Sequence, residues 1–271
     1  MSFTIRFTQD QVDPNSVGVY VLNVPCMLEL YDMEIALSKA YLNYSWYNVT
    51  QSFNNLSFGY TWTDGNFYPV SLLQGFYLIS DLNNELQLTM KANNHYTTDS
   101  NGNDVYYINF LANPNYNLVT LQCTIEPTTS KTPQLTIQNN NFGQLIGFPS
   151  GSYPPTQQTT NYVANSLNVP QISPVRVVYV TCNLASTSGI NSLPNVIECF
   201  SPSVQFGSQI ELKPFQMVYH PLVDGRYPSI KISFVDQNNN PLQLQDSIDV
   251  VECVVRPRKR FSHSHQNAYP Y

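Results

Sequence analysis

The sequence contains little charge. Asp, Glu, Lys and Arg make up 11% of the 271 residues, against about a quarter in ordinary soluble domains. Neutral polar side chains must therefore cover most of the surface, or other subunits must. A stable all-β protein with neutral faces and a subunit of a permanent assembly both fit this composition. The formal net charge of -6 argues against a general coat for nucleic acid.

Long apolar runs are also missing. None could cross a bilayer, and the start, Met1-Ser-Phe-Thr, lacks the basic region and apolar core of a secretory signal. We therefore expect a chain that is not secreted and has no membrane span. The five cysteines are odd in number, widely spaced and mostly within strand-like runs, so we expect reduced and buried thiols. They are Cys26, Cys123, Cys182, Cys199 and Cys253.

Motifs for chemistry are absent as well. The sequence has no Gly-rich phosphate loop, no Cys-X-X-Cys and no His-Glu-X-X-His. We expect surface or core roles for His95 and His220. His263 and His265 would supply only two ligands, too few for a structural metal site. The sequence therefore predicts no enzyme, no cofactor and no metal.

A glycan-active enzyme is the alternative from the catalytic class. It would need two cooperating carboxylates, and the sequence offers Asp224 with Asp236, or Glu198 with Glu211. No spacing argument supports either pair.

Alternation of apolar and polar residues dominates what is present. This period of two predicts at least ten short strands. Helical spacing occurs around residues 80–90, with Ser80 as the expected N-cap, and a short helix should end before Gly147. The predicted fold class is all-β: a single jelly-roll β-sandwich with two short helices and long polar loops.

One set of side chains should point into the sandwich. It comprises Leu42, Tyr44, Trp46, Val178, Val180, Ile232, Phe234 and Val251.

No strong linker divides the chain. We expect one jelly-roll domain over residues 1–255, in which residues 1–16 are a possible arm, followed by a basic tail over residues 256–271. Residues 150–174 are rich in Pro, Gln, Thr and Asn. They predict a long loop, either at a surface or between subunits, or a floppy insertion.

Residues 65–90 carry the most informative block. A strand leads into Gly75-Phe-Tyr-Leu, and Ile79-Ser-Asp-Leu-Asn opens a helix. Other blocks lie at residues 43–49, 56–60, 143–148, 177–184, 230–237 and 249–255. In this order and approximate spacing the blocks resemble the penton, or minor capsid, proteins of Polintons, adintoviruses and virophages. The likeness covers most of the chain, and no block is specific alone.

The resemblance implies a structural viral capsid protein. Its homopentamer would form the vertex of an icosahedral virion beside the major capsid protein of the same virus, after assembly in the host cytoplasm or a virus factory. The chain departs from some pentons in having no evident globular insertion, which counts against a receptor-binding role. The alternative is a glycan-binding jelly roll or spike head, which the Tyr and Trp content allows.

Assembly contacts are expected on an N-terminal arm, an edge strand and the 150–174 loop. The corresponding residues are Phe3, Ile5, Phe7, Pro69 and Tyr153. A strand of the protein's own sheet is the alternative for the arm. The basic residues Arg256, Arg258, Lys259 and Arg260 are expected to touch genome phosphate or an acidic patch on a neighbouring capsomer. An idle, solvated tail is the alternative there.

Overall fold

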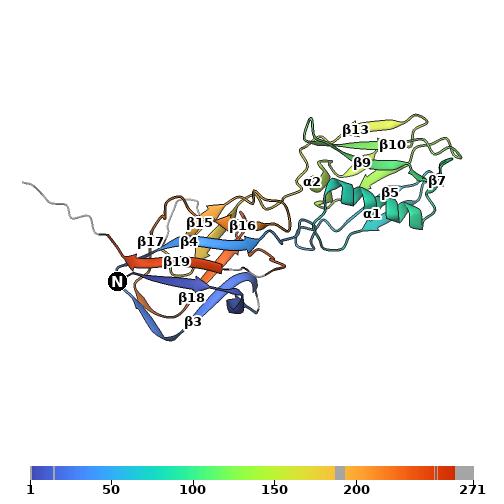
Figure 1. Ribbon diagram of the computed structural model, residues 1–271. Helices are drawn as coiled ribbons and strands as arrows, with labels where there is room; N and C mark the ends of the chain where they lie inside the picture. The colour runs from blue at the N-terminus through green and yellow to red at the C-terminus, as the bar shows by residue number, and fades with distance from the viewer. Residues whose placement is uncertain (1, 15, 187–192, 247, 249, 260–271) are drawn as a thin grey trace, which may run out of the picture. The chain divides into compact units, whose positions relative to one another are not determined.

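The chain forms two compact units in the computed structural model (Figure 1), which describes residues 2–14, 16–186, 193–246, 248 and 250–259. One unit comprises Met1–Trp46 and Val175–Tyr271, and the other comprises Tyr47–Pro174. We call the first the jelly roll and the second the inserted unit. This division differs from the single domain expected over residues 1–255. Local periodicity reveals strands, but it does not reveal which strands bury their faces together.

The jelly roll contains two antiparallel sheets. The first has the order β1-β19-β4-β16, with β17 also paired to β4, and the second has the order β15-β14-β18-β3-β2. The strands of the first sheet are β1 (Phe3–Phe7), β4 (Met33–Asn43), β16 (Gln209–Leu212), β17 (His220–Pro221) and β19 (Val250–Pro257). Those of the second are β2 (Val12–Asp13), β3 (Ser16–Leu30), β14 (Val178–Cys182), β15 (Val196–Phe200) and β18 (Gly225–Val235). The 3-10 helix η1 (Gln9–Gln11) precedes β2.

The strand order defines the fold. If β2 and β17 are set aside and the other strands are numbered along the chain, one sheet reads 1-8-3-6 and the other 5-4-7-2. Successive strands thus alternate between the sheets, except that the fourth and fifth, β14 and β15, pair within one sheet. This is the arrangement of the two interlocked Greek keys of a jelly roll. The inserted unit occupies the connection between the third and fourth of these strands, β4 and β14. The predicted fold class is confirmed, and the jelly roll is built from two separate stretches of the sequence.

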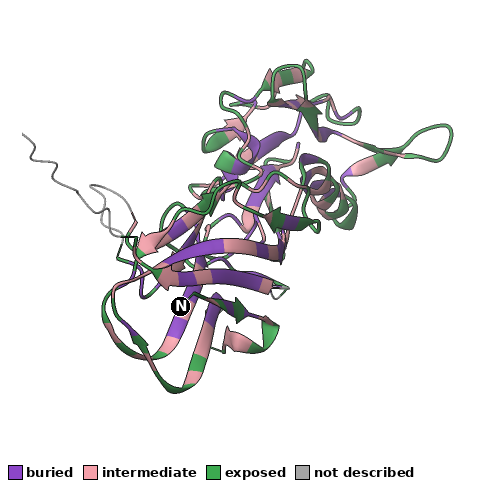
Figure 2. Ribbon diagram, turned by 60° about the vertical axis from the view of Figure 1, so that its left-hand side comes forward, coloured by how far each residue is buried: buried purple, intermediate pink, exposed green. Residues whose placement is uncertain are grey.

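Buried residues alternate with less buried ones along β14 and the second half of β18 (Figure 2). All eight side chains predicted to point inward are buried, and none is more than 4% exposed. Tyr44 and Trp46 lie beyond the end of β4, where their ring centroids are 4.3 Å apart. The period of two therefore identified the core correctly, although it extended the strand too far.

The inserted unit has two small sheets and both α-helices. Its sheets have the orders β12-β11-β5-β6 and β13-β10-β9, beside a separate β7-β8 hairpin. The elements are β5 (Ser57–Thr61), β6 (Phe67–Ser71), α1 (Ile79–Ala92), β7 (Tyr96–Thr98), β8 (Asp104–Tyr106), β9 (Ile108–Asn113), β10 (Leu118–Cys123), β11 (Gln134–Ile137), α2 (Phe142–Ile146), β12 (Gly151–Tyr153) and β13 (Tyr162–Asn165). The expected loop over residues 150–174 therefore contributes strands to both sheets.

Helix α1 covers part of this core with one apolar face. Leu82, Leu86 and Met90 recur every fourth residue and are fully buried. The N-cap expected at Ser80 is wrong, because the helix begins at Ile79. The carboxylate of Asp81 instead accepts a hydrogen bond from the backbone N–H of Leu78 at 2.8 Å.

Helix α2 ends as predicted. Gly147 adopts a left-handed conformation with φ 78°, and a Cβ at this position would lie 2.1 Å from the carbonyl oxygen of Asn168. Phe142 stacks on Phe58 with ring centroids 4.2 Å apart. The helix thus closes an aromatic core, and only glycine fits at its end.

The five cysteines differ in burial. All five cysteines are free; Cys123, Cys182 and Cys253 are buried, whereas Cys26 and Cys199 are exposed. The expectation of buried thiols was therefore wrong for these two. Cys26 lies on β3 between Asn23 and Leu28, where the pairing with β18 shifts register. Cys199 lies on β15, where the pairing with β14 also shifts register. These irregularities interrupt the alternation that would otherwise bury the two thiols.

Candidate assembly surfaces

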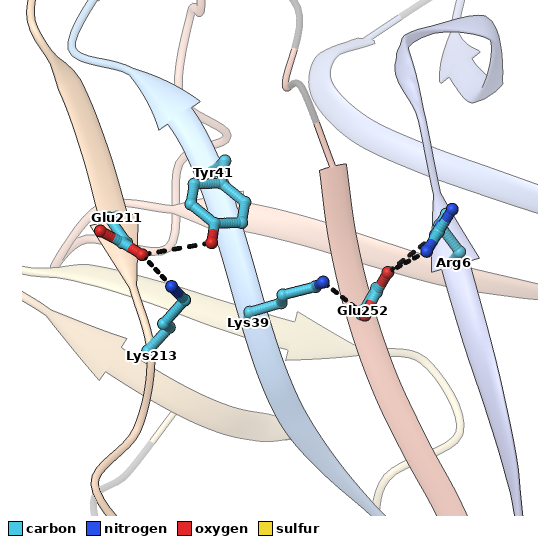
Figure 3. Close-up of polar contacts among 6 residues, drawn as sticks. All are labelled: Arg6, Lys39, Tyr41, Glu211, Lys213 and Glu252. Carbon is cyan, nitrogen blue, oxygen red and sulfur yellow. Dashed lines mark hydrogen bonds and ion pairs between the residues drawn. The ribbon is translucent and has the colours of Figure 1, made fainter.

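The outer face of the β1-β19-β4-β16 sheet carries a row of paired charges (Figure 3). Glu252 on β19 accepts a hydrogen bond from Arg6 Nε of β1 at 2.8 Å, and its other oxygen lies 3.0 Å from Lys39 Nζ of β4. The Lys39 hydrogen bond, with help from Arg6, lowers the pKa of Glu252. This carboxylate is therefore fixed between three neighbouring strands.

A second group continues the row toward β16 (Figure 3). Tyr41 donates a hydrogen bond to Glu211 at 3.2 Å, and Lys213 pairs with the same carboxylate. The Lys213 ammonium also lies 5.4 Å from the ring centroid of Tyr41. Lys213 and Tyr41 lower the pKa of Glu211. Each of these charges is thus paired within the chain, with three cations shared between two carboxylates.

The predicted N-terminal arm is strand β1. It pairs with β19 from Phe3↔Val255 to Phe7↔Val251. Ile5 is 5% exposed and Phe7 is fully buried within the same chain. The expectation that Ile5 and Phe7 dock on a neighbour is therefore wrong, because these side chains fill their own sandwich. The own-sheet alternative is correct, and Phe3 is half-buried at the start of the strand.

The other two expected assembly residues lie in the inserted unit. Pro69 is exposed on β6, which pairs with β5 at the edge of its sheet, as proline predicts. Tyr153 on β12 packs on Phe148 with ring centroids 5.1 Å apart and donates a hydrogen bond to Pro149 O at 3.1 Å. Pro69 thus remains available for contact, whereas Tyr153 already serves its own unit.

The basic run is partly built into the jelly roll. Strand β19 continues to Pro257, where the register pairs Arg256 with Glu34 and Pro257 with Met33. Arg256 Nε lies 2.6 Å from the Glu34 carboxylate, and its guanidinium lies 3.2 Å from the centroid of Tyr219. A tail beginning at residue 256 was therefore wrong. A terminal strand residue needs no ladder donor, so proline is tolerated at that position.

Arg258, one residue beyond the end of β19, is also held by contacts within the jelly roll. Its backbone N–H donates to Asp32 O at 2.8 Å, its Nε donates to Met33 O at 3.0 Å, and its terminal nitrogen contacts Leu222 O. Lys259 is exposed, and Arg260 lies outside the described residues. Within the part that the structure describes, Lys259 is the member of the run that remains directed to solvent.

An apolar segment beside β17 was missed by the sequence reasoning. Leu212 pairs with Ala40 and His220 with Ile35, so residues 213–219 bulge opposite the shorter stretch 36–39 of β4. Phe215 is 107% exposed, Val218 is 56% and Met217 is 41%. We call residues 213–221 the β17 edge. The available signal was the close spacing of Phe215, Met217 and Val218 in the sequence.

The opposite flank of the jelly roll carries a groove. It has a volume of about 460 Å³ and is lined by Asp10, Gln11, Val12, Asp13, Pro14, Val21, Leu22 and Asn23. β18 pairs with one side of β3 at Val21 to Asn23, whereas β2 pairs with its other side at Ser16 and Tyr20. We call this feature the β2–β3 groove. It places an open stretch of strand next to two carboxylates.

A histidine and aromatic cluster lies in the inserted unit. His95 is 8% exposed, stacks on Trp62 at 4.2 Å, and its Nδ1 lies 2.9 Å from the hydroxyl of Tyr60. Burial lowers the pKa of His95, against a smaller opposing effect of Asp64. The predicted core role is confirmed.

Asp224 and Asp236, one carboxylate pair of the catalytic alternative, lie too far apart to cooperate. Asp224 and Asp236 flank the two ends of β18, which spans Gly225–Val235 and therefore separates them by roughly 35–40 Å. Glu211 is held by Lys213 and Tyr41. Among the described residues, no group of three or more His, Cys, Asp or Glu could hold a metal ion. No helix in that same part of the chain is long and apolar enough to span a membrane.

Comparisons with known proteins found structural likeness only. No protein-family model matches the sequence, and no curated protein matches it. The crystal structure of the mavirus penton protein aligns with a TM-score of 0.45 and 11% identity over 94% of this chain and 98% of that one. A chain from the cryo-EM structure of the Sputnik virophage aligns with a TM-score of 0.40 and 10% identity over 95% and 97%. The first of these is a penton protein and the second comes from a virophage; both terms also occur in the resemblance that the sequence shows.

Proposed function

We propose that this chain is a viral capsid protein that forms the pentameric vertex of an icosahedral virion. The observation that carries the proposal is the complete jelly roll with two unlike flanks. One flank bears the exposed apolar β17 edge, and the other bears the β2–β3 groove. A closed ring needs such a heterologous interface, in which two different surfaces of each subunit meet.

Composition supports the same role. Few charges are present, and those on the outer sheet face are compensated within the chain. Obligate interfaces are more apolar than ordinary surfaces, and Phe215, Met217 and Val218 supply an apolar patch. The mechanism is assembly without catalysis, with further copies of this chain and a major capsid protein as partners and the virion as location.

The mass of the purified protein tests the proposal. Light scattering at tens of micromolar should give a pentamer that persists in roughly molar salt, where the Debye length is about 3 Å. Phe215→Ser should leave the melting temperature unchanged, because the side chain is exposed, and should weaken the pentamer at least tenfold. Leu88→Ser on α1, where the leucine is 61% exposed, is the control substitution outside the β17 edge. A monomer under all conditions contradicts self-assembly.

A glycan-binding head is the second candidate. The observation in its favour is the inserted unit, because the sequence had given no sign of a separate globular insertion. Its β9–β10 turn presents Tyr116 at 70% exposure, and exposed aromatic rings stack on sugars. A glycan array compared between the protein and Tyr116→Ala tests it: no reproducible binding, or binding unaffected by the substitution, removes this site.

A further inference from the structure

We infer that the β2–β3 groove receives the C-terminal segment of a second copy of this chain, as an added strand on β3. This inference rests on the proposed assembly and deepens it by naming the contact. The occupant is residues 260–271, which lie outside the described residues.

The groove has the features of a strand-docking site. Val21 to Asn23 pair with β18 on one side only, and β2 covers the other side of β3 no further along than Tyr20. Val12, Pro14, Val21 and Leu22 provide apolar contacts alongside. An extended peptide can therefore pair with the open backbone while its side chains pack against this wall.

Charge selects the segment. Asp10 and Asp13 line the groove, and its lining includes no Lys, Arg or His. The C-terminal segment, Arg260-Phe-Ser-His-Ser-His-Gln-Asn-Ala-Tyr-Pro-Tyr271, has the opposite character, with Arg260, two histidines and no acidic residue. Its aromatic residues suit the apolar wall. The groove and the segment are thus complementary in both charge and polarity.

The length of the segment fits the distance. The last described residues are anchored by Arg258 at Asp32 and Met33, beside the end of β3. Along β18 the partner of Leu30 is Gly225 and the partner of Val21 is Lys231, so the groove begins roughly 15–20 Å further along the sandwich. Residues 260–271, when extended, reach about 40 Å. The segment is therefore long enough to reach a groove at this distance, and the choice between its own copy and a second copy rests on where the chain leaves the jelly roll.

The positions of exit and groove favour a second copy. Arg258 reaches across the start of β4 to Leu222, which follows β17. β17 lies on the side of β4 opposite to β19 and β1, whereas β2 and β3 lie on the β1 side of the sandwich. In a ring with heterologous contacts, the β17 edge of one subunit faces the groove flank of the next. The segment then crosses the subunit interface to reach the groove of the next copy and does not have to pass around the sandwich of its own copy.

Peptide binding tests the contact independently of the ring. A fluorescent peptide spanning residues 259–271 is titrated into a variant that ends at Arg258. We expect saturable binding that weakens at least tenfold in the Asp10→Lys, Asp13→Lys variant. Asp246→Lys, an exposed carboxylate outside the groove, is the matched control. If the double reversal disturbs folding, Asp10→Asn with Asp13→Asn serves instead. The inference is overturned if the peptide does not bind saturably, or if it binds equally well with and without the substitutions at Asp10 and Asp13.

Mixing the variant that ends at Arg258, called the tail-less variant, with the Asp10→Lys, Asp13→Lys variant identifies which copy supplies the groove. The tail-less variant and the Asp10→Lys, Asp13→Lys variant should each associate at least tenfold more weakly than the native chain. An equimolar mixture should regain association, because one member supplies the segment and the other the groove. A mixture that stays monomeric although the peptide binds places the segment in its own groove and overturns the second-copy assignment. If the native chain forms pentamers but the peptide does not bind, this inference is wrong and the proposed function stands. If the peptide binds but the native chain stays monomeric, the proposed function is wrong instead.

Discussion

The cores of the jelly roll and of the inserted unit differ in the types of side chain that fill them. Four of the eight predicted inward positions of the jelly roll are β-branched, among them Val178, Val180 and Ile232, whereas the inserted unit packs Phe58, Phe110 and Phe142 together. Of the twelve lysines and arginines, Lys91 and Lys131 are those within the inserted unit. The comparison shows that the basic residues are concentrated in the jelly roll.

The largest expected effect separates the two cores. Phe234→Ala removes a fully buried ring that meets Tyr20 edge-on at 6.1 Å, and Phe58→Ala removes the partner of Phe142. Each should cost about 3–5 kcal/mol. Calorimetry should show that each substitution lowers the transition of its own unit. Equal shifts of the whole melting profile by both substitutions would show that the units unfold as one.

Acid should affect the inserted unit through His95. Because burial lowers the pKa of His95, the unfolded chain binds its proton more readily than the folded chain does. Stability is therefore full above the unfolded pKa of about 6.5 and decreases as pH falls from there toward the folded pKa. His95→Phe should lose the Tyr60 hydrogen bond, at about 1 kcal/mol, and abolish this pH dependence. Melting of the inserted unit between pH 7.5 and 5 measures both effects, and an unchanged pH slope would contradict the assignment.

The smallest expected effect concerns the charged outer face of the jelly roll. Glu252→Gln should cost about 1 kcal/mol, since it weakens two charge-assisted contacts. The lowered pKa of Glu252 contributes stability above the unfolded value of about 4.3, and that contribution is lost as pH falls through the folded pKa. Urea titrations at neutral and acidic pH check it. Glu211→Gln, whose carboxylate is half exposed, is the control and should have little effect.

Local sequence signals specified most elements. Period two located the jelly-roll core, including Val178 and Phe234, and helical spacing located Leu82, Leu86 and Met90. Errors arose where proline stood at a strand end, as with Pro257, because no ladder donor is needed there. They also arose at the N-terminus, where a strand and an arm have the same alternation.

The candidate surfaces could be predicted only in part. The basic run is visible in the sequence, but the anchoring of Arg256 by Glu34 depends on strand register. The β2–β3 groove requires Asp10 and Val21 to lie near one another, and Phe215 is recognisable as exposed only once β17 is placed. None of these relations is local in the sequence.

The sequence by itself determined the low charge, the all-β class, the inward faces and the two helices, because these follow from composition and from periodicity over a few residues. Tertiary structure alone decided that residues 47–174 form a separate unit and that two unlike flanks exist. The physical reason is that a strand's apolar face can be buried against any complementary sheet. Its partner is chosen by long-range pairing and packing, which local alternation does not encode.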